Sequence, residues 1–359
     1  MAIYLIVSVS LFFLGLGFES VNSITELRYH KKLPNYLYVI PSFILLFVVS
    51  TFRGDFMVDY NNYVEIFNTI NLFGFIESFK SGINIEFGYI LLNRVIGVFT
   101  NDPVYLFAVT TLIILYGFYH QFNKFSVNIW LSVLMFVTVG SYYASFNITR
   151  QILAVAIVFI GSKHLYERRF FKYMLFVFLA FLFHKSALIM IPFYFILNFR
   201  VNLRNLFLFS VGSIAVIFLF QDILSLLQNI GIYDNYTEQA YGMWGQAVAN
   251  VVLPVAFLIF ALLNIKKLDP NNNMHRIWFN ATIFYAVFNI LALQIEMVER
   301  IGRFFAPFPL LLIPFIFSKM QNKYLRVIYM TVLIVTLVTY NYVILSDSRF
   351  DPYYFIWDK

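Results

Sequence analysis

Long apolar stretches recur along the whole chain, separated by short polar connections. Many are roughly 17–20 residues long, which is enough to cross a hydrocarbon core of about 30 Å as a helix. The candidate spans are 2–19, 36–52, 103–119, 128–146, 149–162, 173–183, 187–199, 206–220, 248–265, 277–295, 304–317 and 327–345. The pattern predicts an all-α, polytopic integral membrane protein with about 12 transmembrane helices (range about 10–14).

Segment 87–100 (FGYILLNRVIGVFT) fits this scheme least well. It is short and carries Arg94. If it crossed the membrane, the basic loop 163–172 would lie outside the cytoplasm, against the charge rule for membrane proteins. A re-entrant or amphipathic helix agrees better with its length. The chain is then a single integral domain, 1–359, with both termini outside the cytoplasm.

Charged residues are sorted by side. Sixteen of the 25 Lys and Arg lie in six short loops that hold only four of the 18 acidic residues. Basic loops stay in the cytoplasm, so these six are placed inside. The nine remaining basic residues lie outside with 14 acids. Most of these outside cations stand at helix ends beside carboxylates, amides or His, where we expect the chemistry.

Composition excludes several classes of protein. A chain that is 61% hydrophobic and 12% charged is not an ordinary soluble domain. The absence of Cys excludes disulfides, thiol catalysis and Cys-ligated metals. Basic residues scattered in loops are explained by topology better than by nucleic-acid binding. The N-terminus lacks a basic region and a cleavage site, so it is interpreted as a retained first span.

Two long connections are predicted outside the cytoplasm, 53–102 and 221–247. Long loops in a compact protein are often lids or binding segments. The second combines Tyr, Gln and Trp244, a composition suited to stacking on sugars and to hydrogen-bonding hydroxyls. An ordinary solvated loop is the alternative.

Two polar interruptions occur at the outer ends of spans, at Arg150 and Gln151 and at His184 and Lys185. Arg150 and Gln151 begin a helix, where a guanidinium and the helix dipole suit an anion such as phosphate. A headgroup-contacting Arg is the alternative. His184 and Lys185 interrupt the next apolar pair, and His184 is a general base, a phosphate donor or a structural turn residue.

The densest external cluster is Glu296-Met-Val-Glu299-Arg300-Ile-Gly-Arg303. Its charged residues are three or four positions apart and therefore share one helical face. They bind a diphosphate, position a hydroxyl, or form a plain ion-pair ladder. In the first outer loop, Asp59 and Glu86 are candidate general bases for a hydroxyl nucleophile, and Arg53 adds another cation. No His, Asp and Glu cluster has metal-ligand spacing.

Five motifs occur in order between the apolar stretches: FRGDFMVDYNNY, INIEFGYILLN, SFNITRQILA, AFLFHKSALIMIP and VERIGRFF. Over roughly 50–310 the chain resembles the EpsG-type family of Wzy polysaccharide polymerases. The glycine-rich stretch often seen after the first Arg is reduced here to Gly54. The resemblance implies a GT-C-like glycosyltransferase of the inner (cytoplasmic) membrane that acts without metal or cofactor. It would join O-antigen or exopolysaccharide repeat units carried on undecaprenyl diphosphate, on the outer face.

The resemblance and the residue chemistry together give a candidate site. The catalytic candidates are Asp59, Glu86, His184 and Glu299. The diphosphate-binding candidates are Arg53, Arg150, Lys185, Arg300 and Arg303. The glycan-binding candidates are Tyr60, Gln151 and Trp244. Expected partners are the lipid-linked oligosaccharide, the bilayer, a chain-length regulator and a flippase, with no nucleic acid. A lipid-linked sugar flippase or other transporter, and an O-antigen ligase-like transferase, remain alternatives.

Overall fold

The computed structural model describes residues 2–73, 77, 85–200, 244–293, 296–345 and 352–358. In these ranges the chain is helical, and its extended pairing is limited to an isolated bridge between Arg53 and Phe355. The predicted span 206–220 and most of the predicted outer loop 221–247 lie outside the described residues. The all-α prediction is therefore confirmed for the described part of the chain.

The described helices follow the predicted apolar stretches closely. They are α1 (Ala2–Tyr29), α2 (Tyr36–Thr51), α3 (Tyr60–Leu72), α5 (Phe87–Gly97), α6 (Val104–Phe125), α7 (Ile129–Thr138), α8 (Ser141–Asn147), α9 (Thr149–Tyr166), α10 (Phe170–Phe181), the 3-10 turn η1 (Lys185–Ile189), α11 (Met190–Ile196), α13 (Trp244–Leu263), the 3-10 turn η2 (Ile265–Lys267), α14 (Asn273–Leu291), α15 (Glu296–Gly302), α16 (Pro309–Ser318) and α17 (Lys323–Leu345).

Three of these helices, α1, α6 and α17, are long and apolar enough to cross a membrane. Among the described residues, α7 and α8 taken together are also long and apolar enough, as a pair bent by 45°. Shorter apolar helices make up much of the remainder, so the figure of about 12 spans stays a prediction. The predicted span 128–146 corresponds to the pair of helices α7 and α8, and it is broken at Gly140, which adopts a left-handed φ of 83°.

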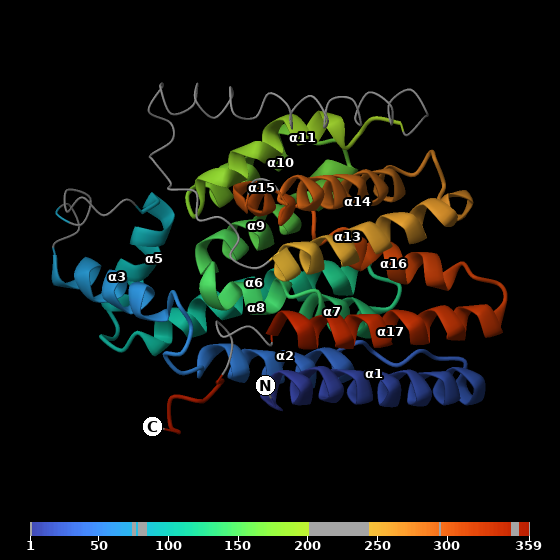
Figure 1. The fold of residues 1–359 in the computed structure, drawn as a ribbon, viewed down its shortest axis with the longest axis horizontal. Coiled ribbons are helices and arrows are strands. Elements are labelled where there is room, and N and C mark those ends of the chain that lie inside the picture. Colours follow the sequence, from blue (N-terminus) through green and yellow to red (C-terminus); the bar gives the residue numbers. More distant parts are fainter. Residues whose placement is uncertain are drawn as a thin grey trace.

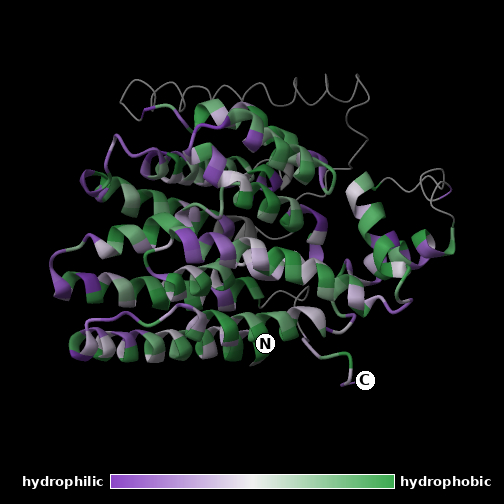
Figure 2. Ribbon diagram, turned by 180° about the vertical axis from the view of Figure 1, so that it is seen from behind, coloured by the Kyte–Doolittle hydropathy of each residue, from purple (hydrophilic) through white to green (hydrophobic). Residues whose placement is uncertain are grey.

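The bundle has two chemically different ends (Figure 1). The turns joining α1 to α2, α13 to α14 and α16 to α17 lie at one end, and α3, α5 and both terminal segments lie at the other. Those three turns carry the basic residues Lys31, Lys32, Lys266, Lys267 and Lys319. Figure 2 shows hydrophobic residues along the helices and hydrophilic ones gathered in the turns. The charge sorting seen in the sequence thus corresponds to two ends of one bundle.

The disputed segment 87–100 forms α5, a helix of 11 residues. Such a helix is about 16 Å long, half of what a crossing requires. It packs on α3, where Arg94 Nη1 donates to the carbonyl oxygens of Ile70 (3.4 Å) and Asn71 (3.3 Å). Arg94 therefore covers the exposed carbonyl end of α3, which accounts for an Arg in an otherwise apolar segment.

The last described residues pack on the loop that follows α2. Gly54 N–H donates to the Tyr354 carbonyl (2.8 Å), and Ile356 N–H donates to the Phe52 carbonyl (3.0 Å). A Cβ on Gly54 would overlap the Tyr354 ring, so the close approach requires glycine. The last described residues are therefore fixed to the loop after α2, at the end of the bundle that carries α3 and α5.

Candidate active site

Glu86 joins three segments that are far apart in the sequence. It is the extended residue that precedes α5. Its Oε2 accepts from Arg150 Nη1 at 2.5 Å, and its Oε1 accepts from the Lys185 backbone N–H at 3.3 Å. The Glu86 side chain is 9% exposed and that of Arg150 is 26% exposed. A pair this enclosed is held by charge-assisted hydrogen bonds, and removing one partner would strand the other charge.

The backbone approach beside Glu86 is also tight. Gly88 N–H donates to the Leu182 carbonyl oxygen at 2.7 Å. A Cβ on Gly88 would lie 2.7 Å from the same oxygen, closer than carbon and oxygen can approach. Glycine at this position therefore lets the start of α5 dock on the turn between α10 and η1, which brings Glu86 to Arg150.

His184 is held as a neutral ring in one orientation. Its Nδ1 accepts from the Ser186 backbone N–H at 3.2 Å and contacts the Ser186 hydroxyl at 2.8 Å. Burial lowers the pKa of His184 to about 4, and the charge of Glu86 opposes this only in part. Because a backbone N–H can only donate, Nδ1 is the acceptor and the ring proton lies on Nε2. His184 is thus a hydrogen-bond donor at neutral pH.

Asp59 is the open carboxylate of the site. It precedes α3, is half-buried, and forms no side-chain cap hydrogen bond there. It also forms no ion pair with any residue in the described ranges. Burial raises the pKa of Asp59, and the positive charges of Arg150 and Arg300 offset this only in part. Arg150 on α9 and Arg300 on α15 both act on Asp59, which precedes α3, and on His184, which precedes η1. The helices α9 and α15 also both contact η1, so these residues share one region of the structure.

The helix α15 contributes two arginines in different states. Arg303 Nη2 donates to Glu299 Oε1 at 2.5 Å, one turn away on the same helix. Arg300 is exposed, and its guanidinium forms no hydrogen bond or ion pair within the part of the chain that the structure describes. The buried Gln151 side chain donates to the Arg300 carbonyl at 2.6 Å and so fixes α15 to α9.

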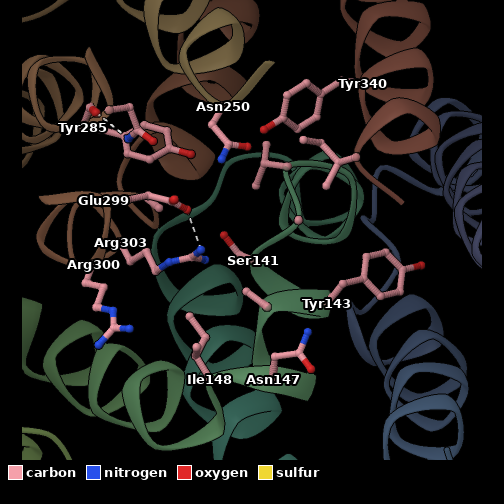
Figure 3. A pocket seen from close by; sticks show the side chains of 16 residues that line it. Ser141, Tyr143, Asn147, Ile148, Asn250, Tyr285, Glu299, Arg300, Arg303 and Tyr340 are labelled. Carbon is pink, nitrogen blue, oxygen red and sulfur yellow. Dashed lines mark hydrogen bonds and ion pairs between the residues drawn. The ribbon is translucent and has the colours of Figure 1, made fainter. Parts of the chain in front are cut away.

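A pocket of about 230 Å³ opens beside α15 (Figure 3). Its walls come from the break between α7 and α8, from α13, α14 and α15, and from α17. Polar side chains supply much of the lining, and the ion pair of Glu299 and Arg303 stands at its wall. Arg300 belongs both to this wall and to the group around Asp59 and His184.

A family model for the EpsG family matches residues 35–355, nearly the whole chain. The chain belongs to the EpsG family. No curated protein and no solved structure matches it. Membership in the EpsG family indicates a membrane protein with a polysaccharide polymerase type of function. The resemblance seen in the motifs is thereby confirmed.

Arg53 and Tyr60, two further candidates in this EpsG-family chain, lie in an aromatic layer. Arg53 is 2% exposed, and its Cζ lies 4.4 Å from the Phe107 ring centroid and 4.9 Å from that of Phe146. Its guanidinium donates to the carbonyls of Ser50 and Phe146. Tyr60 stacks on Phe107, one of the two rings that contact Arg53, with 4.6 Å between the ring centroids. Both residues hold the outer loop in place by packing.

Two further sequence candidates are Lys185 and Trp244. Lys185 is exposed and lies beside Glu86 through its backbone N–H. Trp244 is the first residue of α13, and its side chain is outside the described part of the structure, as is that of Glu296. The structure thus brings together Asp59, Glu86, Arg150, Gln151, His184, Lys185 and Arg300, while Glu299 and Arg303 line the adjoining pocket.

Sequence reasoning missed the polar residues of the pocket. They are Ser141, Asn250, Tyr285, Asn289 and Tyr340. Tyr285 and Asn289 are one turn apart on α14 and face the same side, so their spacing was a usable signal. Tyr340 lies in an apolar stretch where tyrosine is common, and nothing in its neighbourhood distinguished it.

Proposed function

We propose that this protein is a Wzy-type polysaccharide polymerase with its active site between α3, α9, α15 and η1. It would transfer a growing glycan from undecaprenyl diphosphate to a lipid-linked repeat unit on the extracytoplasmic face. The observation that carries this proposal is that Arg300 and Asp59, whose charges interact, have no ion-pair partner among the described residues, whereas Glu86 pairs with Arg150 and Glu299 pairs with Arg303. An unpaired cation suits an anionic leaving group, and an unpaired carboxylate suits proton abstraction.

The proposed diphosphate-binding residues are those whose cationic side chains are accessible in the structure. Arg300 has a free, exposed guanidinium fork, which matches phosphate oxygens in bidentate fashion. Arg150 keeps part of its guanidinium accessible while Glu86 fixes its orientation. Lys185 adds an exposed ammonium group beside them, and Arg303 adds charge from the pocket wall. Arg53 is enclosed by aromatic rings and serves this site by holding the outer loop.

Asp59 is the proposed general base. Glu86 is bound to Arg150 and Glu299 is bound to Arg303, so each of these carboxylates is already occupied by an ion pair. Asp59 lacks such a partner, and burial raises its pKa toward the range in which a base works well near neutral pH. His184 presents a fixed N–H donor that stabilises negative charge on an oxygen of the substrate.

The proposed reaction balances without a co-reactant. The acceptor hydroxyl oxygen forms a bond to the anomeric carbon of the donor sugar as the bond from that carbon to the diphosphate oxygen breaks. The bonding electrons leave with undecaprenyl diphosphate, whose growing negative charge the arginines stabilise. The hydroxyl proton passes to the Asp59 carboxylate. The arginines and Lys185 supply the positive field, so the proposal needs no metal.

Variants in cells test this assignment. Arg300→Ala and Asp59→Asn are each expected to abolish long-chain polysaccharide while the protein still inserts in the membrane at wild-type abundance. Arg28→Ala is the matched control for the first, because Arg28 is an exposed Arg at the last turn of α1. Glu65→Gln is the control for the second, because Glu65 is an exposed carboxylate on α3. Normal chain-length ladders from both site variants would refute the proposal.

A further inference from the structure

The pocket beside α15 has the chemistry of a site for a neutral polar ligand. Its two charged side chains that face each other, Glu299 and Arg303, neutralise one another at 2.5 Å. Figure 3 shows the hydroxyl of Tyr340 and the amide of Asn250 directed toward the cavity, with Tyr285 on the adjoining wall. Neither tyrosine hydroxyl forms a hydrogen bond with the described part of the chain, so both are available to a ligand.

Two further groups on the walls lack partners. The Asn147 side-chain oxygen and Arg303 Nε are both buried without a hydrogen bond in the described structure, and both residues line the pocket. A buried polar atom left without a partner costs roughly 1–3 kcal/mol, so native structures keep few of them. A ligand that carries several hydroxyl groups supplies both donors and acceptors and satisfies such a mixed lining.

The size of the cavity limits the ligand to one ring. A volume of about 230 Å³ is below the roughly 300–1,000 Å³ of pockets that hold drug-sized molecules. A single sugar ring is compatible with that space, and an oligosaccharide would extend out of it.

The position of Arg300 indicates which sugar of the substrate occupies the pocket. Arg300 lines the pocket, and its charge also acts on Asp59 and His184 in the neighbouring cluster. A ligand that fills the pocket and contacts the free guanidinium of Arg300 must carry a neutral polar ring next to an anion. In a lipid-linked glycan, the sugar bonded directly to the diphosphate has that arrangement.

We propose that the pocket between the α7–α8 break, α14, α15 and α17 is the subsite for the diphosphate-linked sugar of the donor. Asn250, Tyr285 and Tyr340 contact its hydroxyl groups, and Arg300 contacts the adjoining phosphate. This inference rests on the proposed polymerase function, and it makes the first sugar of the repeat unit the one that this site selects.

A binding experiment on the full-length purified protein tests the subsite. The probes are undecaprenyl diphosphate and the same lipid bearing one glucose, galactose, N-acetylglucosamine or N-acetylgalactosamine. At least one sugar is expected to bind more tightly than the bare lipid. Tyr285→Phe, Tyr340→Phe and Asn250→Leu should each reduce that sugar-dependent gain roughly two- to tenfold while leaving the bare lipid unaffected.

Controls separate the subsite from the proposed function. Tyr329→Phe alters a tyrosine of α17 that is 44% exposed and does not line the pocket, so it should preserve the gain. Arg300→Ala should weaken the bare and the sugar-bearing lipids alike. If Arg300→Ala leaves the bare lipid unaffected, the proposed function fails. If no sugar adds affinity, or if the pocket variants keep the gain or weaken the bare lipid equally, the subsite proposal fails instead.

Discussion

The ion pair of Glu86 and Arg150 should contribute a measurable coupling energy to folding. The perturbation is a double-mutant cycle with Glu86→Gln, Arg150→Gln and the double variant. Exposed pairs contribute about 0–1 kcal/mol, whereas breaking a fully buried pair costs about 3–5 kcal/mol. With side chains 9% and 26% exposed and a contact of 2.5 Å, the pair lies between these limits. Each single variant is therefore expected to lose about 2–3 kcal/mol of stability.

The double variant should lose less than the sum of the two singles, because the second change no longer leaves a charge unpaired. We expect a coupling of about 1–2 kcal/mol. Unfolding by SDS titration in mixed micelles, followed by tryptophan fluorescence, measures it, and the buried Trp130 and Trp278 provide the signal. Glu65→Gln is the control, because Glu65 is exposed on α3. Additive losses, or a coupling that disappears in high salt as exposed pairs do, would refute the reasoning.

Further predictions concern the glycines Gly88 and Gly140 and the proposed general base Asp59. Gly88→Ala should cost about 1–3 kcal/mol and lower activity, because its Cβ meets the Leu182 carbonyl; Gly17→Ala, with open space around it, should not. Gly140→Ala should cost about 1–2 kcal/mol in thermal unfolding from its left-handed φ alone. Asp59 must be ionised to act, so activity should fall as pH drops through its raised pKa. Asp59→Asn should strongly lower activity yet unfold no more easily at neutral pH; a destabilised Asp59→Asn would contradict the assignment.

The sign of the Asp59 stability effect follows from its pKa. Burial raises the pKa in the folded protein above its unfolded value, so the folded state binds the proton more tightly. The stability that this provides is present at low pH and is lost as the pH rises through the folded pKa. At neutral pH the ionised carboxylate opposes folding, which a neutral Asn avoids. A catalytic residue that destabilises the fold is a common compromise between stability and activity.

Hydrophobic stretches predicted most of the described helices, because a membrane helix must be apolar over its whole length. The prediction 36–52 agrees with α2 within a residue, and 327–345 agrees with the end of α17. Two differences have local causes. The helix α1 continues to Tyr29 because helix formation does not stop where apolar residues end. The break at Gly140 depends on a left-handed φ, which hydropathy does not register.

The charged members of the candidate site could be named from the sequence because charges beside apolar spans are rare. Which of these charges pair with one another could not be predicted from the sequence. Glu86 and Arg150 are 64 positions apart, and Gln151 and Arg300 are 149 positions apart, so only the packing of α5, α9 and α15 brings them together. That packing decides which carboxylate and which Arg remain free, Asp59 and Arg300, and the sequence offered no means to separate these from their paired neighbours.

Polymerisation by the purified protein tests the central claim most directly. The substrate is a synthetic undecaprenyl-diphosphate repeat unit, and the products are separated by chain length. The account predicts a ladder with release of undecaprenyl diphosphate, unchanged by EDTA. Asp59→Asn should lower the rate about 10²–10⁴-fold, as expected for loss of a general base, and Arg300→Ala should also lower it, while Glu65→Gln matches the wild type. An unchanged substrate with wild-type protein, or equal ladders from all variants, would contradict the account.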